Sequence, residues 1–328
     1  MAPQPHTVRW GIMATGWIAE MFVKDLLTNP AARHVQDVAH KLVAVASSTS
    51  KDSAASFLTK VKAPEGVTTY GSYAELVADP DVDIVYVATP HSHHFQNTML
   101  ALEAGKNVLC EKAFTVTAAQ AKKLVETARS KKLFLMEAVW TRYFPLAYCT
   151  IASPNKKKEA PKTVAAINKY ATGADEMTNI ILQFPKHKSM GIAMTCLRIP
   201  TDTDGHNSSG PAIKIQGPLG EIQVMGPAFK PLQYRVIKKD SAGKVEIVDC
   251  PIPQDRERDW GHGMFWEADE CARCLRDGKK ESSTLPWEES IVIMEIMEEA
   301  LKQGGVDYPE LITTDVYDAK SPLNTGKR

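Results

Sequence analysis

The stretch that decides the fold is Asp83-Ile-Val-Tyr-Val-Ala-Thr-Pro90, followed by a helix-like run and then by Asn107-Val-Leu-Cys-Glu-Lys112. Residues 83–88 form a short apolar run rich in β-branched side chains, which is typical of a strand buried in a parallel sheet. Thr89 and Pro90 end this strand, and residues 107–110 form the next predicted one. Glu111 and Lys112 therefore fall at the carboxyl end of a strand, where open α/β sheets bind their ligands.

Lys112 has two interpretations at this position. A lysine that enters a cleft can donate a charged hydrogen bond, or it can transfer a proton if it is desolvated. Alternatively, Glu111 and Lys112 form a surface pair that follows a strand and has no chemical role. Spacing alone does not decide between the two.

The composition is that of an ordinary globular chain and excludes several classes of function. The 328 residues suffice for two domains, and 39 basic residues balance 39 acidic ones. This balance offers no attraction for nucleic acid or for an anionic membrane. No long apolar run and no apolar leader is present, and six scattered cysteines suit a reducing compartment, so we expect a cytoplasmic protein. Cys271 and Cys274 lack two further ligands at suitable spacing, so we expect no metal site.

Upstream, residues 7–14 form a plausible first strand, and a helix with an apolar face follows from about Ile18. Between them lies a variant of the dinucleotide-binding fingerprint G-x-G-x-x-G, with alanine in place of the first and third glycines. Gly16 stands where a side chain would block the approach of a pyrophosphate. The alternative is a simple helix-capping turn. The predicted cofactor-binding residues of this loop are Ala14, Thr15, Gly16, Trp17 and Ile18.

The second strand, residues 41–46, is followed by Ser47-Ser-Thr-Ser-Lys51. Sites for NAD usually place Asp or Glu here, where the carboxylate holds the ribose 2′-hydroxyl. No carboxylate occurs before Asp52, whereas hydroxyl groups and a lysine suit a 2′-phosphate. We therefore predict NADP as the cofactor, with Ser47, Ser48 and Lys51 in its site. The alternative is a polar turn in which Asp52 provides the acid.

Strands and helices alternate over residues 7–139, which predicts a doubly wound parallel sheet. From about Thr163 the pattern changes to short strand-like runs separated by turn residues, and we expect them to form one largely antiparallel open sheet. Two helices close the chain, around residues 265–275 and 293–301. Between the two parts, Lys156-Lys-Lys158 is most simply a solvated loop.

Six motifs together resemble the glucose–fructose oxidoreductase / inositol dehydrogenase (Gfo/Idh/MocA) family. Within it, the similarity is greatest to NADP-dependent D-xylose 1-dehydrogenases and to dihydrodiol dehydrogenases. The motifs are Trp10-Gly-Ile-Met-Ala-Thr-Gly-Trp-Ile-Ala19, Tyr70-Gly-Ser-Tyr-Ala-Glu-Leu76, Ala88-Thr-Pro-His-Ser-His-His94, Ala104-Gly-Lys-Asn-Val-Leu-Cys-Glu-Lys112, Glu137-Ala-Val-Trp-Thr-Arg142 and Gly261-His-Gly-Met-Phe-Trp-Glu-Ala-Asp269.

The resemblance implies an NADP-binding α/β Rossmann domain over residues 1–145 and an α+β domain for substrate and dimerisation over residues 146–328. It implies an oxidoreductase that oxidises the anomeric carbon of an aldopyranose, D-xylose, to D-xylonolactone, and a homodimer formed through the sheet of the second domain. Lys112 matches the family lysine that holds the reacting oxygen and the nicotinamide ribose, and His94 matches a histidine near the nicotinamide, so both are predicted catalytic residues. Further predicted cofactor contacts are Thr89, Pro90, His91, His94, Glu111, Lys112 and Arg142.

The chain departs from the family pattern in two places. Ala113 replaces the commoner proline after Lys112. More importantly, the family's Asp-x-Gly-x-Tyr motif, whose Asp and Tyr take part in catalysis, has no counterpart, and Pro145 is followed almost directly by Pro161. The resemblance therefore implies the loss of an internal segment, and we expect weak activity together with a sheet that has an exposed edge and an uncovered apolar face. Tyr148 and His206 are alternative candidates for the catalytic base.

Three other interpretations stay open. A dihydrodiol could replace the sugar as substrate in the same chemistry. A non-catalytic regulator of sugar metabolism could bind the dinucleotide without turnover, as one member of the family does. The chain could also be a truncated product that folds poorly. Turnover distinguishes the enzyme from the last two, and cooperative unfolding that depends on the dinucleotide distinguishes those two from each other.

Overall fold

The computed structural model describes residues 4–144, 159–200, 202–240, 243–256 and 258–325. The chain divides into two compact units that are interleaved in sequence. Unit 1 consists of Met1–Trp140, Gln254–Glu298 and Tyr308–Arg328, and unit 2 of Thr141–Pro253 and Glu299–Asp307. The assignment of all residues from 146 onward to a single substrate domain stays a prediction. The run of three lysines at 156–158 lies outside the described residues.

Unit 1 contains a six-stranded sheet in the order β3-β2-β1-β4-β5-β6, in which every pair is parallel. This is the doubly wound order of dinucleotide-binding folds, with its reversal point between β1 and β4. The predicted parallel sheet is therefore confirmed. The strands are β1 (His6–Met13), β2 (Val38–Ala46), β3 (Thr68–Tyr70), β4 (Ile84–Val87), β5 (Asn107–Glu111) and β6 (Leu135–Ala138).

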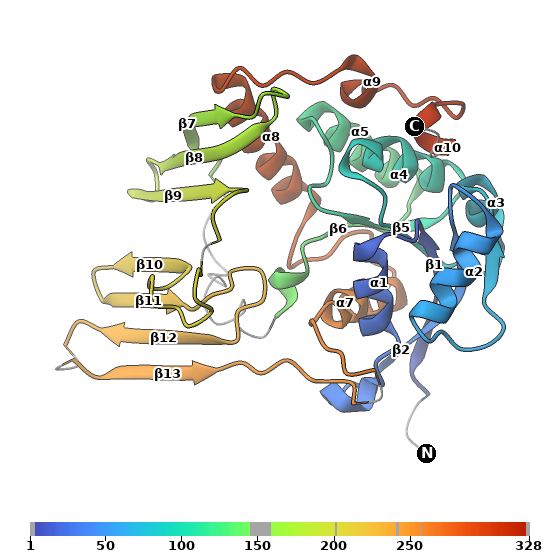
Figure 1. Ribbon diagram of the computed structural model, residues 1–328, viewed down its shortest axis with the longest axis horizontal. Helices are drawn as coiled ribbons and strands as arrows, with labels where there is room; N and C mark the ends of the chain where they lie inside the picture. Colours follow the sequence, from blue (N-terminus) through green and yellow to red (C-terminus); the bar gives the residue numbers. More distant parts are fainter. Residues whose placement is uncertain (1–3, 145–158, 201, 241–242, 257, 326–328) are drawn as a thin grey trace. The chain divides into compact units, whose positions relative to one another are not determined.

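Helices cover both faces of this sheet. On one face, α7 packs on β1 and β2 beside α1, and on the other face α3, α4 and α5 lie next to one another. Figure 1 shows α4 and α5 on one side of β5 and β6, with α7 on the other. The helices are α1 (Trp17–Leu26), α2 (Lys51–Lys60), α3 (Tyr73–Ala78), α4 (His94–Glu103), α5 (Ala118–Lys131), α7 (Phe265–Arg276), α8 (Trp287–Gln303), α9 (Glu310–Thr313) and α10 (Pro322–Thr325), with 3-10 helices η1 (Pro30–Arg33), η2 (His91–His93) and η3 (Trp140–Tyr143).

Local signals in the sequence explain where several helices begin. Ser50, Ser72 and Thr117 each accept a hydrogen bond from the backbone N–H three residues later, which satisfies an otherwise unpaired helix donor. At α5 the side chain of Gln120 also returns to the backbone of Thr117, which completes a capping box.

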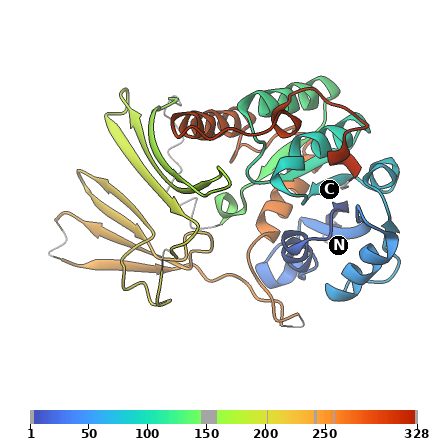
Figure 2. The ribbon, with the colours of Figure 1, turned by 45° about the horizontal axis from the view of Figure 1, so that its top comes forward.

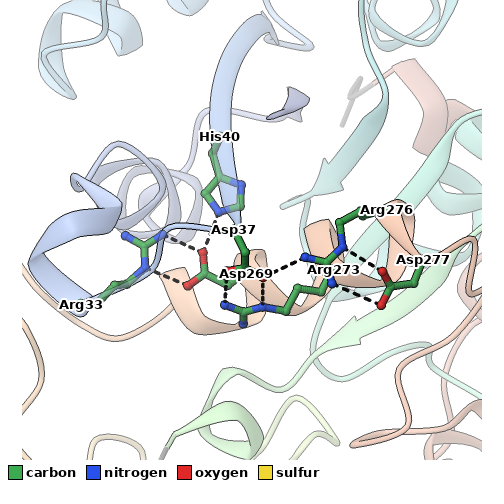
Figure 3. A network of polar contacts seen from close by, with 7 residues as sticks. All are labelled: Arg33, Asp37, His40, Asp269, Arg273, Arg276 and Asp277. Carbon is green, nitrogen blue, oxygen red and sulfur yellow. Dashed lines mark hydrogen bonds and ion pairs between the residues drawn. The ribbon is translucent and has the colours of Figure 1, made fainter. Parts of the chain in front are cut away.

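A buried polar network fixes α7 to the sheet (Figure 3). The guanidinium of Arg33 donates two hydrogen bonds to the carboxylate of Asp269, at 2.7 and 2.8 Å. His40 accepts from the indole N–H of Trp10 through Nδ1, at 3.1 Å, so its Nε2 carries the proton and donates to Asp269 at 2.9 Å. Burial works against the charge of Asp269, but the hydrogen bonds from Arg33 and His40 lower its pKa, so Asp269 is an ionised carboxylate at neutral pH.

Unit 2 contains two antiparallel sheets, which Figure 2 shows in yellow-green and gold. The antiparallel pairing is confirmed, but the strands are divided between two sheets rather than joined in one. Between β9 and β10 the described residues form turns and no strand, so the ladder does not continue. The first sheet has the order β7-β8-β9 and the second β10-β11-β12-β13. The strands are β7 (Lys162–Lys169), β8 (Asp175–Phe184), β9 (Ser189–Cys196), β10 (Ile213–Gly217), β11 (Gly220–Val224), β12 (Gln233–Lys238) and β13 (Val245–Asp249).

One face of the three-stranded sheet is apolar and exposed. The register pairs Val164 with Ile181, and Ile181 with Ile192, so these three side chains form a row across the sheet. Met190 and Met194 lie on the same side of the edge strand, because side chains two residues apart share a face. Ile192 is 77% exposed and Met194 is 70% exposed. The expected uncovered apolar face is therefore confirmed, and Val164, Ile181, Met190, Ile192 and Met194 are called the apolar face below.

The opposite face of this sheet is partly covered by the end of α8. Gln303 binds the strand at its backbone, accepting from the N–H of Ala165 at 2.7 Å and donating to the carbonyl of Thr163 at 3.0 Å. Lys169 donates to the carbonyl of Gly305 at 2.7 Å. A side chain at Gly304 would collide with Ile167, so this position needs glycine for close packing.

Two negative observations concern the described residues only. No helix among them combines the length and the apolarity that crossing a membrane requires. No group of three or more His, Cys, Asp and Glu side chains is arranged there to hold a metal ion. Cys271 and Cys274 are buried thiols of α7, and burial raises the pKa of Cys274 to about 12.

Candidate active site

The fingerprint loop lies between β1 and α1 at the carboxyl edge of the sheet. Ala14 follows the strand directly, and its N–H donates to the carbonyl of Ala46 at the end of β2, at 3.0 Å. Its φ of +84° lies in the left-handed region that favours glycine, so the alanine in the first fingerprint position carries local backbone strain. The loop therefore keeps the conformation that the glycine of the usual motif would adopt.

Gly16 is the N-cap of α1, and no side chain caps the helix there. A methyl group built on Gly16 would meet no atom within 4 Å, so the space in front of the first helical N–H groups is open. Such an uncapped helix start suits an anion, because its N–H groups and the helix dipole both favour negative charge. Trp17, the first helical residue, is 69% exposed beside this space. The loop thus fits the pyrophosphate of a dinucleotide.

Hydroxyl groups gather at the end of β2. Ser47 and Thr49 share a hydrogen bond between their hydroxyls at 2.8 Å, and Ser50 caps α2 through the N–H of Ser53 at 3.1 Å. The side chain of Ser48 is hydrogen-bonded to the hydroxyl of Tyr73. Lys51 opens α2 and is exposed, and no carboxylate lies between the strand and this lysine. Hydroxyl donors, a helix start and a cation suit a phosphate better than a neutral ribose hydroxyl pair.

The end of β4 carries the predicted residues Thr89, Pro90, His91 and His94. Pro90 and His91 are exposed, whereas Thr89 and His94 are buried. Both ring nitrogens of His94 face backbone carbonyls, with Nδ1 at 2.9 Å from the oxygen of Ala113 and Nε2 at 3.0 Å from that of Thr89. Burial lowers the pKa of His94 to about 4, so the ring is neutral at pH 7 and donates to only one of these two oxygens. His94 therefore ties the end of β4 to the turn after β5, and a direct contact with a cofactor stays a prediction.

Lys112 is the first residue after β5, and its side chain is exposed. No hydrogen bond or ion pair joins its ammonium group to a residue in the described ranges. The residue before it points the opposite way: Glu111 is 4% exposed and accepts from the Tyr86 hydroxyl at 2.5 Å and from the N–H of Lys112 at 3.1 Å. An exposed cation thus stands on a turn whose base is fixed by a buried acid.

More acidic groups surround the base of this turn than the sequence pattern predicts. Burial raises the pKa of Glu111, against the opposing hydrogen bonds from Tyr86 and Lys112. Burial also raises the pKa of Glu267 on α7 well above its usual range, and the negative charges of Glu111 and Asp25 add to the shift. No hydrogen-bond partner for either carboxylate oxygen of Glu267 occurs among the described residues. The surroundings of Glu267 thus favour the neutral form of its carboxyl group.

The remaining predicted residues lie elsewhere. Arg142 belongs to η3 and to unit 2, so its role at the cofactor stays a prediction. His206, one alternative base, is exposed in a turn of unit 2. Tyr148, the other alternative, lies outside the described residues, as does part of the stretch where we expect the lost segment. Sequence reasoning gave no role to Tyr86 or Glu137, although both stand inside predicted strands at positions where an apolar residue would be usual.

Comparison with known proteins agrees with the geometry of unit 1. The profile described as "Oxidoreductase family, NAD-binding Rossmann fold" matches residues 8–139. A solved structure of levoglucosan dehydrogenase in complex with NADH and levoglucosan superposes with a TM-score of 0.71 at 14% identity, over 91% of this chain and 98% of that one. At this identity the match concerns the fold alone.

Two curated proteins are similar over nearly their whole length. D-xylose 1-dehydrogenase (NADP(+)) of Hypocrea jecorina is 57% identical over 390 aligned positions, which cover 99% of each chain. Trans-1,2-dihydrobenzene-1,2-diol dehydrogenase of Homo sapiens is 31% identical over 354 positions, covering 92% of this chain and 98% of the human protein. The alignment of 390 positions is longer than the 328 residues of this chain, so the Hypocrea protein has internal residues that this chain lacks.

Proposed function

This chain belongs to the Gfo/Idh/MocA family of oxidoreductases, and we propose that it oxidises the anomeric carbon of D-xylose with NADP+, giving D-xylonolactone. The observation that carries the proposal is the 57% identity to an NADP+-dependent D-xylose 1-dehydrogenase across 99% of both chains. The geometry of unit 1 agrees with it, since an open helix start and an acid-free strand end lie at the same edge of the parallel sheet.

The proposed cofactor site uses the loops that follow β1, β2, β4 and β5 of unit 1. Ala14, Thr15, Gly16, Trp17 and Ile18 would hold the pyrophosphate at the start of α1, and Ser47, Ser48 and Lys51 would bind the 2′-phosphate. Hydrogen bonds to a charged partner contribute about 1.5–3 kcal/mol each, so one or two of them would favour NADP over NAD by roughly ten-fold or more. The nicotinamide end is assigned to Thr89, Pro90, His91, His94, Glu111, Lys112 and Arg142.

The proposed chemistry needs a hydride acceptor and a base. NADP+ supplies the acceptor when it is bound. Lys112 is assigned to the reacting oxygen of the sugar, because its ammonium group is exposed, without a described ion-pair partner, and fixed at the carboxyl edge of the sheet. A cation at this oxygen stabilises the negative charge that develops as the hydroxyl proton leaves.

We assign the base of the family reaction to a tyrosine in the segment that this chain lacks. The support is the absence of an Asp-x-Gly-x-Tyr motif from the sequence and the surplus of aligned positions in the Hypocrea protein. Loss of a positioned acid–base group typically costs about 10²–10⁴ in rate. The chain is therefore proposed to be a slow D-xylose dehydrogenase that keeps its cofactor site.

Two further features belong to this proposal. A homodimer would form through the sheet of unit 2, because pairing two copies of the apolar face removes its large side chains from water. The activity would take place in the cytoplasm, because Cys110, Cys196, Cys271 and Cys274 are free thiols that suit a reducing compartment.

A dihydrodiol is the second candidate substrate, favoured by the 31% identity to the human dihydrodiol dehydrogenase. The test is the rate of NADPH formation by the purified chain with D-xylose, other aldopyranoses and trans-1,2-dihydrobenzene-1,2-diol, each with NADP+ and with NAD+. The proposal expects D-xylose with NADP+ to give the highest rate. A higher rate with the diol would select the second candidate, and binding of NADP+ without oxidation of any substrate would indicate a non-catalytic regulator.

A further inference from the structure

The turn that carries Lys112 is held by side chains rather than by a backbone ladder. The N–H of Lys112 donates to Glu111 at 3.1 Å, and the N–H of Phe114 donates to Glu137 at 3.0 Å. The carbonyl of Ala113 faces His94 at 2.9 Å, and the carbonyl of Phe114 accepts from the thiol of Cys110 at 3.8 Å. Four backbone groups in three successive residues are thus fixed from outside the turn.

Two of these holders are buried carboxylates on neighbouring strands. Glu111 ends β5 and Glu137 lies on β6, and each is 4% exposed. In the register of the two strands Cys110 pairs with Glu137, so the second acid comes in from the side, below the turn. Tyr86 on β4 holds Glu111 in turn through its hydroxyl at 2.5 Å. Side chains from the three adjacent strands β4, β5 and β6 therefore hold the turn that carries Lys112.

We propose that Glu137 is a positioning residue for Lys112, acting together with the Tyr86–Glu111 pair through the backbone of the turn. This inference rests on the proposed function, in which Lys112 binds the reacting oxygen. Glu111 fixes the first N–H of the turn and Glu137 the last, and both carboxylates are buried, whereas the side chain of Lys112 is exposed. Each side-chain oxygen accepts from a backbone N–H that would otherwise lack a partner in this buried turn.

A rigidly held turn matters for Lys112 because a lysine side chain is long and flexible. A fixed backbone limits the positions that its ammonium group can reach. Displacement of a reacting group by about 1 Å can cost roughly 10²-fold in rate. Glu137 accepts from the N–H of Phe114, two residues after Lys112, so we expect its effect on turnover to run through the backbone of the turn.

The test compares two substitutions at Glu137 in the full chain. Glu137→Gln keeps an oxygen that accepts from Phe114, whereas Glu137→Leu removes the acceptor at a similar size. Glu103→Gln, on an exposed side chain paired with Lys131 at 2.9 Å, is the control for loss of a surface carboxylate. Three properties are measured: hydrogen exchange of residues 108–116 without cofactor, affinity for NADP+, and NADPH formation with D-xylose at high enzyme concentration.

We expect Glu137→Leu to speed amide exchange in the turn by about ten-fold, as loss of one buried hydrogen bond implies, and to slow NADPH formation by roughly 10²-fold. Glu137→Gln should stay within about three-fold of the parent chain in both properties, since it keeps the acceptor. The affinity for NADP+ should change little in either variant, because the loops at residues 14–18 and 47–51 are untouched.

The inference is overturned if Glu137→Leu leaves exchange in the turn unchanged, or if exchange rises while the rate of NADPH formation does not fall. It is also overturned if Glu137→Gln is as slow as Glu137→Leu, because the carboxylate would then act by its charge or its proton. Absence of NADPH formation in the parent chain would refute the proposed function instead, and the exchange comparison would still decide whether Glu137 holds the turn.

Discussion

Strands β4 and β9 make an instructive pair, because both are apolar and their surroundings differ completely. Ile84, Val85, Tyr86 and Val87 of β4 are each 0% exposed, since helices cover both faces of the parallel sheet. In β9, Met190 is 66% exposed and Ile192 is 77% exposed, although the strand pairs well with β8 along its length. Within the described residues, β4 is hydrogen-bonded to a strand on each side and the edge strand β9 on one side only, and their burial differs as well.

The difference shows that neighbouring residues in the sequence can determine where a strand forms, whereas the stability of that strand depends on distant parts of the structure that bury it. Pairing with β8 satisfies one edge of β9, but the main favourable term in folding is the removal of apolar area from water. In unit 1 that cover comes from distant parts of the same chain, including α7 and its anchor at Asp269. In unit 2 no described residue covers the apolar face, so its large side chains stay exposed.

The strongest way to break the comparison is to remove the anchor of unit 1. Arg33→Met leaves the carboxylate of Asp269 buried with His40 alone, and breaking a buried ion pair costs about 3–5 kcal/mol. All six tryptophans lie in unit 1, so their fluorescence during urea unfolding reports on this unit only. The control is Arg276→Gln, which removes an exposed pair with Asp37 and should shift the transition far less. Equal shifts in the two variants would contradict the account.

Acid should lower the free energy of unfolding of unit 1 through the buried His94. The pKa of His94 is lowered by burial to about 4 from an ordinary 6.5, so between these values the unfolded chain binds a proton that the folded chain refuses. The free energy of unfolding therefore falls as pH falls through this window, by about 1.4 kcal/mol per pH unit. The pKa of Glu111 is raised, so this group stabilises the folded state as pH falls and opposes the effect of His94. Because Glu111 is present in both the parent and His94→Gln, its contribution cancels when the two proteins are compared. Parallel stability curves for the two proteins between pH 6.5 and 4 would refute this assignment.

The cofactor preference proposed for unit 1 is tested by Lys51→Ala. Removal of the cation at the start of α2 should weaken NADP+ by roughly ten-fold, about 1.5 kcal/mol, and change the affinity for NAD+ little, because only the 2′-phosphate needs the charge. Titration of tryptophan fluorescence with each cofactor measures both constants. Lys132→Ala, at the far end of α5, is a control for loss of a surface lysine. An equal loss for the two cofactors would show that Lys51 does not read the phosphate.

The smallest effect on stability is expected at the apolar face. Ile192→Lys places a charge on a side chain that is already exposed, so the tryptophan-monitored unfolding of unit 1 should change by less than about 0.5 kcal/mol. The same substitution should dissociate the proposed homodimer, which sedimentation velocity measures directly. Lys214→Glu, an exposed substitution in the other sheet of unit 2, serves as the control. An unchanged dimer in Ile192→Lys would exclude the apolar face as its interface.

Much of the fold could be predicted because its signals are local. The β-branched run at residues 83–88 depends only on neighbours in sequence, and the strand that it predicts is present. The capping box at Thr117 and Gln120 is an equally local feature. The position of Lys112 directly after a strand could also be predicted, from the apolar residues 107–110 that precede it. Ala14 shows the limit of motif matching, because the loop keeps a glycine-like φ of +84° although its residue differs.

The rest depended on contacts that no local pattern records. Arg33 and Asp269 are separated by more than two hundred residues, and each alone resembles an ordinary surface charge. Tyr86 lies within an apolar strand, so nothing in the sequence marks its hydroxyl as the partner of Glu111. The division of unit 2 into two sheets depends on the residues between β9 and β10, which carry turn signals that do not reveal whether the strands on either side pair.

The central claim is that the chain keeps its NADP site while it lacks the base that turnover needs. The most direct test compares this chain with one that carries a family-like segment between Leu146 and Pro161, measuring NADP+ affinity and NADPH formation with D-xylose for both. The account predicts similar affinities and a rate roughly 10²–10⁴-fold higher in the chain with the segment. An equal, high rate in the chain without the segment would contradict it, because another residue would then have to act as the base.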